Sequence, residues 1–470
     1  MKARRRLLVA LAVAALAPAA AHADGLTQEQ AVAIALKRSR DAIAARLEIE
    51  GAELDVVAAR VYPNPTFSYE MGNLVLGKGN PQGGAANPGF FDQPIQQFGL
   101  SQTLDLWSKR GARESVASAG VDRRRLLTED ALREIAYAVR SAFADVVREQ
   151  SERDLAREVA GRYAETVRLS QARFKAGDIS EAELRKIELE AIRYENAVID
   201  ADMQWDVARQ ALAALMGLGS ARELPGERVD DSAARPTFDV EKLTNEALTR
   251  RPDLRAAGAA HAIAEAEVKA ARREIYPDLT LGATYTHDSF TISGDNPDSL
   301  GFGVSLPLPV FDRNKAGLGR ARLDVKRADN DRERLRLAVA HDVADAVRKA
   351  ARAQSLLRIF EGSATPPGEA PPAAPAPNST SAAGPPAAAA TSPVASGQVD
   401  VRNAGGMLAR AEAALRVAEK SYKAGAASLL DLLEAQRTNL DTRAEYLRVL
   451  YDYRQAVVDV THAVGEGAVP

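Results

Sequence analysis

The feature that most limits the fold of this sequence is a stretch without proline from about Ser108 to Lys175. Apolar residues recur in it at three- and four-residue spacing, which is the pattern of one face of an α-helix. At about 1.5 Å per residue, such a helix would reach roughly 100 Å. A helix of that length needs neighbours along most of it, so the stretch predicts long coiled-coil packing.

The same series of landmarks occurs twice in the chain, which predicts an internal two-fold repeat. Val61-Tyr62-Pro63 returns as Ile275-Tyr276-Pro277, and Phe174-Lys175-Ala176-Gly177 returns as Tyr422-Lys423-Ala424-Gly425. In each repeat we expect a helix, a strand, a loop, a strand, a very long helix, a tip and a return helix. The predicted organisation is a first repeat over residues 24–220, a linker over 221–240 and a second repeat over 241–470. A Pro/Ala-rich segment from about 361 to 400 interrupts the second repeat and should be disordered, because it cannot bury a core.

The first 23 residues have the pattern of a secretory signal peptide. Four basic residues precede an apolar run from Leu7 to Ala17, and Ala21-His22-Ala23 offers a small-x-small cleavage site. We expect cleavage after Ala23. A membrane anchor is the alternative, but the apolar run is short for a bilayer. The sequence contains no cysteine, which excludes disulfides, thiolate metal sites and lipid attachment through an N-terminal Cys.

Four short segments alternate between apolar and small polar residues, and they form two predicted strand hairpins at about 65–106 and 278–310. The strands are expected at Pro65–Met71, Phe98–Leu106, Leu279–Thr286 and Phe302–Leu308. Period two with one apolar face is typical of transmembrane strands, although two ordinary hairpins on a soluble core would show it too. Loops over residues 72–93 and 288–299 would then face outside.

Aromatic residues stand at the predicted ends of these hairpins, beside basic residues, as at a membrane–water boundary. They are Tyr62, Trp107, Tyr276 and Phe311. Four strands cannot close a barrel, and an open sheet edge is not tolerated in lipid. Three chains would supply about twelve strands, which is enough for a barrel with a lumen. The strands therefore predict a homotrimer.

Two short turns are each predicted to join a pair of helices at the exposed end of a helical hairpin, which we call a tip. Gly177 and Gly425 are natural left-handed helix stops, and Ser180 and Ser428 are good N-caps for the helices that follow. Glu183 completes a capping box with Ser180. We interpret both turns as the end of a hollow helical cylinder that lies away from the membrane.

With these landmarks the chain resembles the TolC-like outer-membrane efflux protein family, over essentially everything after the signal. The segments 101–111 and 62–65 are most similar to the heavy-metal branch. The resemblance implies a mainly α protein with a small transmembrane β part: a homotrimer whose twelve-stranded outer-membrane barrel continues into an α-helical periplasmic coiled-coil tunnel. The missing lipid-acceptor Cys and the Pro/Ala-rich segment depart from the family's pattern.

The resemblance also implies partners and cargo. Such proteins are the exit ducts of tripartite pumps or of type I secretion systems, and they dock with a periplasmic adaptor and an inner-membrane transporter. In the heavy-metal branch the transporter is of the resistance-nodulation-division type and the cargo is a divalent cation.

The resemblance implies site residues at the tips. Asp431 and Glu434 match carboxylates at the tunnel entrance, where threefold symmetry would make rings that attract cations. The alternative is that acids in a first turn complement the helix dipole. Tyr422 and Glu183 match an aromatic-to-carboxylate hydrogen bond that helps hold the entrance shut, unless Glu183 is occupied by its cap on Ser180. Ala427 stands where a basic partner is expected.

Other classes of function find little support in the sequence. A formal charge of -3 gives no electrostatic case for nucleic acid. The histidines are isolated, and no nucleophile motif or phosphate-binding glycine loop appears, so we expect no enzyme activity, no cofactor and no resident metal. A periplasmic coiled-coil scaffold would explain the helices and the signal, but it would leave the paired amphipathic strands unexplained.

Overall fold

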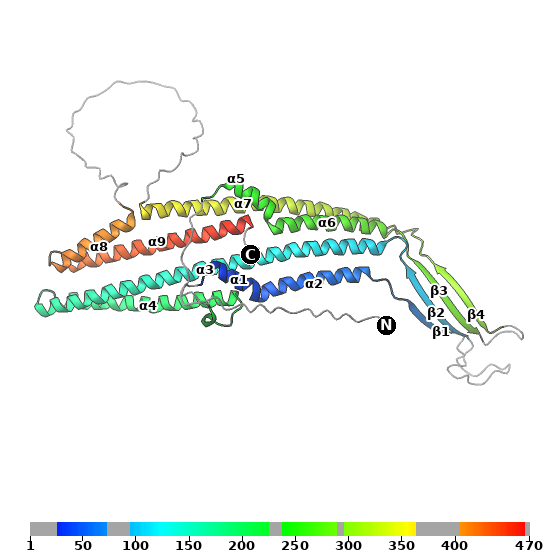
Figure 1. The fold of residues 1–470 in the computed structure, drawn as a ribbon, viewed down its shortest axis with the longest axis horizontal. Helices are drawn as coiled ribbons and strands as arrows, with labels where there is room; N and C mark the ends of the chain where they lie inside the picture. Colours follow the sequence, from blue (N-terminus) through cyan, green and yellow to red (C-terminus); the bar gives the residue numbers. More distant parts are fainter. Residues whose placement is uncertain (1–25, 73–94, 225–236, 289–295, 363–404, 466–470) are drawn as a thin grey trace, which may run out of the picture. The chain divides into compact units, whose positions relative to one another are not determined.

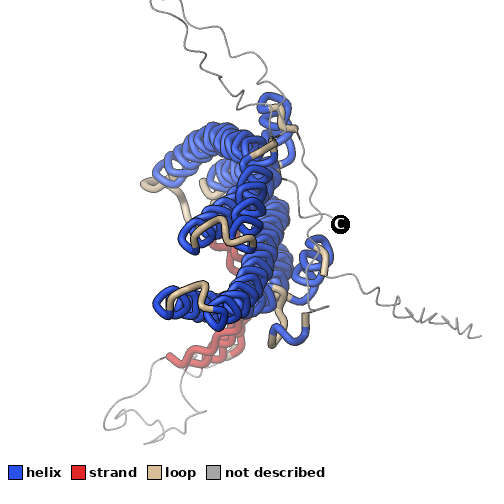
Figure 2. Tube along the Cα trace, turned by 90° about the vertical axis from the view of Figure 1, so that its left-hand side faces the viewer, coloured by secondary structure: helices blue, strands red, loops and turns tan. Residues whose placement is uncertain are grey.

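The computed structural model describes residues 26–72, 95–224, 237–288, 296–362 and 405–465. The predicted signal peptide, most of the predicted linker, almost all of the Pro/Ala-rich segment and most of both predicted outer loops lie outside these residues. Helices make up most of the described chain, and its strands form one sheet (Figures 1 and 2). Within the described residues, no helix is both long enough and apolar enough to cross a membrane.

Two compact units divide the chain, and each takes segments from both halves of the sequence. We call them the strand unit (residues 40–136, 238–346 and 460–470) and the tip unit (residues 1–39, 137–237 and 347–459). Three helices run through both units: α3 (Lys109–Ala176), α7 (Lys315–Glu361) and α9 (Leu429–Val464). The proline-free stretch is thus one continuous helix of 68 residues, as the sequence predicts.

The strand unit contains a four-stranded antiparallel sheet in the order β1-β2-β3-β4. Its strands are β1 (Thr66–Gly72), β2 (Ile95–Leu104), β3 (Leu279–Asp288) and β4 (Asp298–Ser305). Helices α2 (Arg40–Arg60), α5 (Val240–Arg250) and α6 (Pro252–Arg273) belong to the same unit. Because β2 pairs with β3, the two predicted hairpins form one continuous sheet.

The bounds of two predicted strands were wrong by a few residues. The second strand ends at Leu104 and not at Leu106, because Asp105 turns out of the ladder to bind the first N–H groups of α3. The fourth strand begins at Asp298 and ends at Ser305, before Pro307 and Pro309, which have no N–H to donate to a ladder.

The tip unit is a helical layer in which polar side chains join α3 to α9. Its other elements are α1 (Gln28–Arg38), α4 (Glu181–Leu215), the short 3₁₀ helix η1 (Ala221–Glu223) and α8 (Met407–Lys423). The hydroxyls of Ser151 and Tyr451 lie 2.6 Å apart, and both guanidinium Nη atoms of Arg443 bind Glu158 at 2.8 Å. Apolar clusters fill the space between these polar contacts, for example Leu155, Val159 and Tyr163.

Two glycines bring the end of α7 and the start of α8 into backbone contact, and we call this junction the glycine neck. Gly362 has φ +74° and follows the last residue of α7, and Gly406 caps the start of α8. A Cβ on either glycine would overlap the backbone of the other segment, since it would meet Gly406 N or Phe360 O. The segment with the Pro/Ala-rich sequence therefore leaves and rejoins the tip unit at one point.

Two buried arginines hold the C-terminal end of α9 in the strand unit. Arg133 donates to the carbonyl of His462 at 2.9 Å, and Arg251 donates to the carbonyl of Ala463 at 3.4 Å. Arg251 is also bound by Asp253 at 2.6 Å and by Asp342 at 3.1 Å. These guanidinium groups bind carbonyls in the last turn of α9, where the regular intrahelical hydrogen bonds run out.

Candidate functional site

Both predicted tips are short turns with the same backbone geometry. Gly177 and Gly425 have φ +84° and +75°, in the left-handed region. In the first turn Asp178 N donates to Arg173 O at 2.9 Å, and in the second Ala426 N donates to Ser421 O at 2.9 Å. This is a Schellman motif, and glycine is required because a side chain is strained at such φ values.

Each tip continues into a helix that begins with a capping box. Ser180 N and Oγ donate to the carboxylate of Glu183 at 2.8 and 2.9 Å. Ser428 N and Oγ donate to the carboxylate of Asp431 at 3.0 and 2.8 Å. Hydrogen bonds from the N–H and the hydroxyl of Ser180 lower the pKa of Glu183, and those from the hydroxyl and N–H of Ser428 lower the pKa of Asp431. Both carboxylates therefore stay ionised at neutral pH.

Tyr422 is the buried anchor of the second tip. Its ring packs in a cluster with Ile187, Leu429 and Leu432. Its hydroxyl lies 3.2 Å from Ser170 Oγ, and the guanidinium of Arg173 stands 4.6 Å from the ring centroid. The predicted contact between Tyr422 and Glu183 is not among the hydrogen bonds of the described residues.

Asp431 and Glu434 lie on one exposed face at the start of α9, three residues apart. Asp431 completes a cap with Ser428, which was not predicted from the sequence, while a complement to the helix dipole stays the alternative for acids in this first turn. Asp431 remains exposed at the tip while it caps α9. One carboxylate can therefore both cap the helix and stand at a channel entrance. Glu434 follows on the same exposed side.

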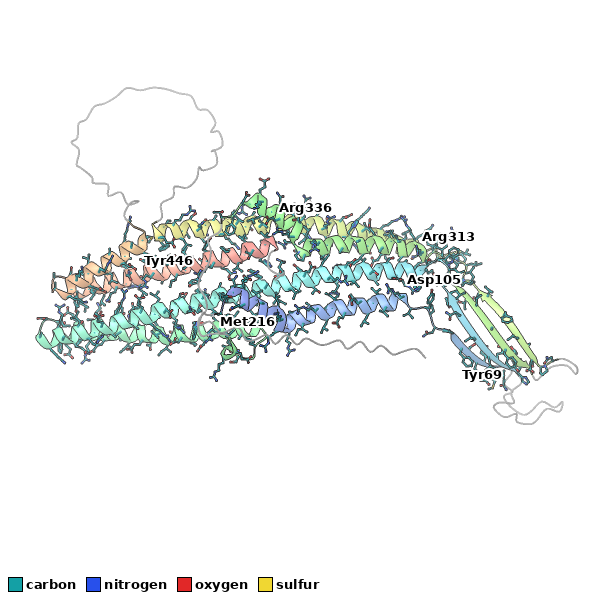
Figure 3. The ribbon with its side chains drawn as sticks, viewed as in Figure 1. Tyr69, Asp105, Met216, Arg313, Arg336 and Tyr446 are labelled. Atoms are coloured by element: carbon teal, nitrogen blue, oxygen red, sulfur yellow. The ribbon has the colours of Figure 1, made fainter. Side chains whose placement is uncertain are left out.

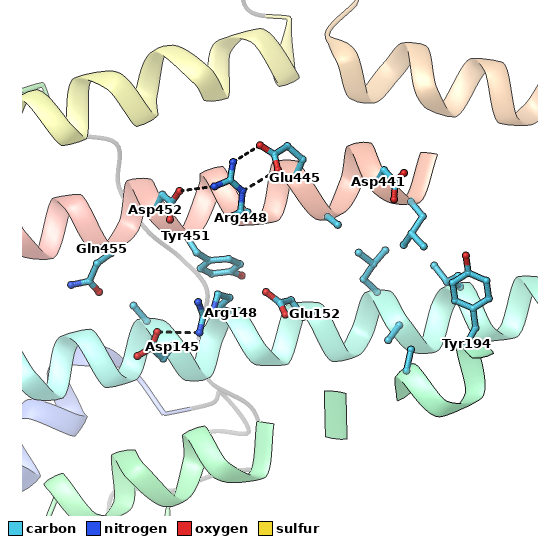
Figure 4. Close-up of a pocket in the computed structure, with 17 residues that line it drawn as sticks. Asp145, Arg148, Glu152, Tyr194, Asp441, Glu445, Arg448, Tyr451, Asp452 and Gln455 are labelled. Atoms are coloured by element: carbon cyan, nitrogen blue, oxygen red, sulfur yellow. Dashed lines mark hydrogen bonds and ion pairs between the residues drawn. The ribbon is translucent and has the colours of Figure 1, made fainter. Parts of the chain in front are cut away.

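A hollow of about 780 Å³ separates α3 from α9 further from the tips, with α4 at its margin (Figure 4). Arg148 of α3 binds Asp145 at 3.5 Å, and Arg448 of α9 binds Glu445 and Asp452. Burial, followed by the neighbouring Glu149, raises the pKa of Glu152 at its edge. Each arginine thus binds acids of its own helix, and the hollow combines these charged groups with a largely apolar lining between α3 and α9.

The sheet has one apolar face and one polar face, and side-chain contacts confirm the division. Tyr69, Phe98 and Tyr285 form a row across three strands, with ring centroids 4.9 and 6.3 Å apart. On the other face Thr103 and Thr280 share a hydrogen bond of 3.3 Å. In most of the register like residues stand opposite each other, as in Phe67 with Leu100 and Ser68 with Gly99, although Met71 stands opposite Gln96.

Asp105 organises the junction between β2 and α3 (Figure 3). Its carboxylate accepts from the backbone N–H groups of Trp107, Lys109 and Arg110 at 3.2, 2.9 and 2.6 Å. Burial tends to raise the pKa of Asp105, but these three N–H groups lower it below its ordinary value. The carboxylate also complements the positive end of the helix dipole.

The side chain of Lys109, almost wholly buried, ties this junction to the second half of the chain. Its Nζ lies 3.1 Å from Asp278 and 3.3 Å from Glu274. In the second half Asp312 accepts from Asn314 N at 2.8 Å just before α7. Ser108 and Asn314, the residues before the two long helices, both have positive φ, at 55° and 51°. The two junctions therefore share a carboxylate and a left-handed residue at the helix start.

Three of the four predicted boundary aromatics contact the junction. Trp107 stacks on Tyr276 with centroids 4.8 Å apart, and its Nε1 donates to Pro277 O at 3.1 Å. The guanidinium of Arg110 lies 4.3 Å from the centroid of Tyr62. Phe311 is fully exposed, with a relative accessibility of 101%, so no part of the chain that the structure describes packs against it.

Sequence reasoning missed Asp105, Lys109 and the arginines at the end of α9. Asp105 was read as part of a strand face, although an Asp a few residues before a helix is a capping signal. Lys109 and Arg251 gave no local signal, because their partners come from distant segments. Among the described residues, no three His, Asp or Glu side chains come close enough to hold a metal ion.

Comparison with known proteins identifies this architecture. Residues 31–218, 243–364 and 390–466 match the family model for the outer membrane efflux protein. The chain belongs to the outer membrane efflux protein family. The channels of this family are the outer-membrane components of tripartite efflux systems, which also contain an adaptor and an inner-membrane pump.

Relatives and solved structures agree with the family assignment. The cobalt-zinc-cadmium resistance protein CzcC of Cupriavidus metallidurans is 26% identical, over 94% of this chain and 91% of its own. The pyoverdine export outer membrane protein OpmQ of Pseudomonas putida is 24% identical, over 93% and 86%. The outer-membrane channel OprN has the same fold, with a TM-score of 0.68 at 19% identity over 94% of this chain and 91% of its own.

Proposed function

We propose that three copies of this chain form one outer-membrane barrel, which continues as a periplasmic helical tunnel. The observation that carries the proposal is the sheet: within the residues that the structure describes, β1 and β4 are each paired on one side only. One face of this sheet is apolar, and hydrocarbon does not tolerate unpaired backbone groups. Copies that pair β4 with the next β1 satisfy both edges and close twelve strands around a polar lumen.

Exposed apolar residues on the helices that adjoin the two edge strands in sequence support the same assembly. Helix α2 leads to the edge strand β1 and exposes Leu47, Leu54 and Val57 by 55 to 67%. Helix α7 follows the other edge strand, β4, and exposes Leu323 and Leu337 by 52 and 58%. Each free sheet edge is thus continued by a helix with an unpacked apolar side, as expected where copies meet head to tail.

The aromatic rows support a lipid boundary at each end of the sheet. Tyr69, Phe98 and Tyr285 form one row, and Trp107 with Tyr276 forms the other. From Phe98 to Leu104, β2 covers about 20 Å at 3.3 Å per residue, and Trp107 lies beyond it. Outer-membrane barrels likewise have aromatic girdles at both interfaces of their apolar band.

Fractionation tests the assembly. We expect the mature protein in outer membranes, as a trimer that dissociates to monomers only when heated in detergent. Pure protein that is monomeric and dissolves without detergent would contradict the proposal, because it would leave the two sheet edges unpaired.

For the cargo, we propose a divalent cation, delivered by a resistance-nodulation-division pump through a periplasmic adaptor. The relative CzcC and the exposed tip carboxylates favour this over an organic cargo. A deletion strain should lose tolerance to zinc, cobalt or cadmium and regain it with the intact gene. Sensitivity to dyes and antibiotics alone, or loss of siderophore export, would reassign the cargo while leaving the duct intact.

At the entrance, we propose that Asp431 and Glu434 form rings that favour cations. In planar bilayers, Glu434→Gln should lower cation over anion selectivity, and Asp431→Asn should lower it and also weaken the cap on Ser428. Unchanged selectivity in both variants would contradict the proposal that these carboxylates form cation-selective rings. The proposed latch between Tyr422 and Glu183 has its own test: Glu183→Ala should raise ion conductance, and an unchanged conductance would exclude Glu183 from the gate.

A further inference from the structure

The two junctions where a strand leads into a long helix have matching residues, but these residues differ in what they contact. Trp107 and Lys109 precede and begin α3, and Phe311 and Arg313 hold the same places before α7, 204 residues later. Trp107 stacks on Tyr276, and the almost wholly buried Lys109 binds two carboxylates from the other half of the chain. The first junction thus has its partners within the chain.

The second junction has no comparable partners in the part of the chain that the structure describes. Phe311 is fully exposed, and no carboxylate there forms an ion pair with Arg313 or with Lys315, the exposed first residue of α7. The nearest acid in sequence, Asp312, accepts from Asn314 N at 2.8 Å, and the first turn of α7 contains no acid. The guanidinium of Arg313 donates to a backbone carbonyl at 3.4 Å, which leaves its charge unneutralised.

An apolar stripe leads from the sheet to these groups. Val304 of β4 stands opposite Leu281, on the apolar face of the sheet. Beyond the end of β4, Leu306, Leu308 and Val310 continue the apolar residues at every second position, and all four are 44 to 73% exposed. The apolar surface of the edge strand therefore continues almost to the start of α7.

These groups lie at the height where the proposed barrel leaves the bilayer. Asn314 Nδ2 donates to the carbonyl of Ala271 near the end of α6 at 2.9 Å, and the chain reaches Tyr276 five residues later. Figure 3 shows Arg313 and Asp105 at the same end of the helices, next to the sheet. The stripe would thus lie in the hydrocarbon, and the ring and the two cations at the membrane surface, where aromatic and basic residues gather.

The occupant of this surface must be apolar along the stripe and negative beyond it. A phospholipid with an anionic headgroup has both properties. Its acyl chains can cover the stripe and the ring, and its phosphate can accept hydrogen bonds from a guanidinium and an ammonium group. A free anion such as inorganic phosphate would leave the apolar stripe uncovered.

The next copy in the proposed trimer is a poorer match in charge. There the chain that enters β1 would run beside the chain that leaves β4. Residues 60–65 of that segment contain Arg60 and no acid, so they add positive charge and supply no counter-ion. The cations of the second junction therefore need an anion from outside the protein.

We propose that the second junction binds an anionic phospholipid from the leaflet on the helical side of the membrane. The lipid surface consists of the stripe from Leu306 to Val310 together with Phe311, Arg313 and Lys315. The inference rests on the proposed barrel and adds to it a lipid class and a binding site. In the first junction the lysine at the place of Arg313 is already neutralised, so the preference for anionic lipid comes from the second junction.

Native mass spectrometry of the detergent-purified trimer tests the lipid surface, with phosphatidylglycerol and phosphatidylcholine titrated in separate arms. The natural protein should bind phosphatidylglycerol more tightly, and added salt should reduce the difference, because exposed charges are screened. Arg313→Gln/Lys315→Gln should weaken phosphatidylglycerol binding about fivefold for each charge removed and leave phosphatidylcholine binding unchanged. Inorganic phosphate should not displace the lipid, since it cannot cover the stripe.

The matched control is Lys326→Gln/Arg332→Gln. It removes two exposed positive charges from the same helix, about 16 and 26 Å further along than Lys315. This variant should bind phosphatidylglycerol as the natural protein does. An equal loss in both double variants would assign the effect to net charge and overturn the site, as would a natural protein without preference for phosphatidylglycerol.

A labelling experiment distinguishes lipid from the next copy as the occupant. Phe311→Cys carries the sole thiol of the chain, and in the reconstituted trimer it should react with a membrane-soluble maleimide. A thiol that reacts only after the trimer is dissociated by heat would show that the next copy covers this position, and it would overturn the lipid surface while the proposed duct stands. If no heat-modifiable trimer forms at all, it is the proposed function that fails.

Discussion

The two helical tips have the same glycine turn and serine cap, but they differ in how deeply the aromatic residue before the turn is buried. Both have a left-handed glycine, a Schellman turn and a serine capping box. Phe174 and Tyr422 hold the same place in the two turns, three residues before the glycine. Phe174 is 40% exposed, whereas Tyr422 is 1% exposed and reaches Ser170 of α3.

This difference separates the features of a tip that its own short segment determines from those that need contacts elsewhere in the tip unit. The turn and the cap follow from residues within one short segment. The burial of Tyr422 requires Ile187 of α4 and Ser170 of α3, which are far away in sequence. Tyr422 therefore anchors the second tip on the first hairpin, whereas the matching Phe174 is partly exposed.

The largest expected effect comes from removing the anchor. Tyr422→Ala should destabilise the tip unit by about 3–5 kcal/mol, because it empties a buried aromatic site. Phe174→Ala at the matched position should cost less than about 1 kcal/mol, since its ring is already partly in water. Limited proteolysis of the α8–α9 turn and thermal unfolding followed by circular dichroism would measure both. Equal losses would show that the two tips are equivalent after all.

The glycines should behave alike at both tips. Gly177→Ala and Gly425→Ala should each cost about 1–2 kcal/mol, because both residues have positive φ and nothing lies within 4 Å of an added Cβ. Backbone strain is then the whole effect, and it does not depend on the anchor. Thermal unfolding of the two variants side by side checks this. A loss at one tip only would mean that the turns differ more than their dihedral angles indicate.

The caps should give a smaller and again symmetrical effect. Ser180→Ala and Ser428→Ala should each cost about 1 kcal/mol, since each removes the side-chain acceptor for an N–H at a helix start. Threonine at either position is the matched control and should recover most of the loss. Hydrogen exchange of the first turns of α4 and α9 reports the opening of each helix start.

The smallest expected effect is a dependence on pH that comes from the contact between the two hairpins and not from either tip. Glu158 joins α3 to α9, and its hydrogen bonds with Arg443 hold its pKa below its ordinary value. The folded pKa is lowered, so the stabilisation is complete above about pH 4.5 and is lost as pH falls through the folded value. The pair is partly exposed, so the loss should be no more than about 0.5 kcal/mol. Arg443→Gln should flatten this dependence; a slope that survives the substitution would assign it to other groups.

Local signals in the sequence predicted much of this molecule. The 68-residue helix, the glycine stops, the serine caps and the alternating strands all depend on residues close together in the chain. The strand ends were less predictable, because Asp105 fits both a polar strand position and a helix cap. Asp105 takes the helix-cap role because it binds N–H groups at the start of α3, and these are placed around it only once α3 has formed.

Long-range contacts could not be predicted in the same way. Lys109 is buried against Asp278 and Glu274, which lie in the other half of the sequence. Arg133 and Arg251 meet at the end of α9, more than two hundred residues after either of them. Charged residues like these are common on exposed helix faces, so nothing in their local sequence marks them as buried.

The glycine neck holds the end of α7 against the start of α8. The number of residues between these two helices can therefore change without moving either of them. The first half needs one unbroken helix to reach its tip, whereas the second half reaches its tip in two pieces whose ends touch at Gly362 and Gly406. Because backbone contact at Gly362 and Gly406 already holds the two ends together, sequence can be added or removed between them at little entropic cost. The position is a natural place to graft a reporter domain, or for evolution to try out a new one, without disturbing the duct.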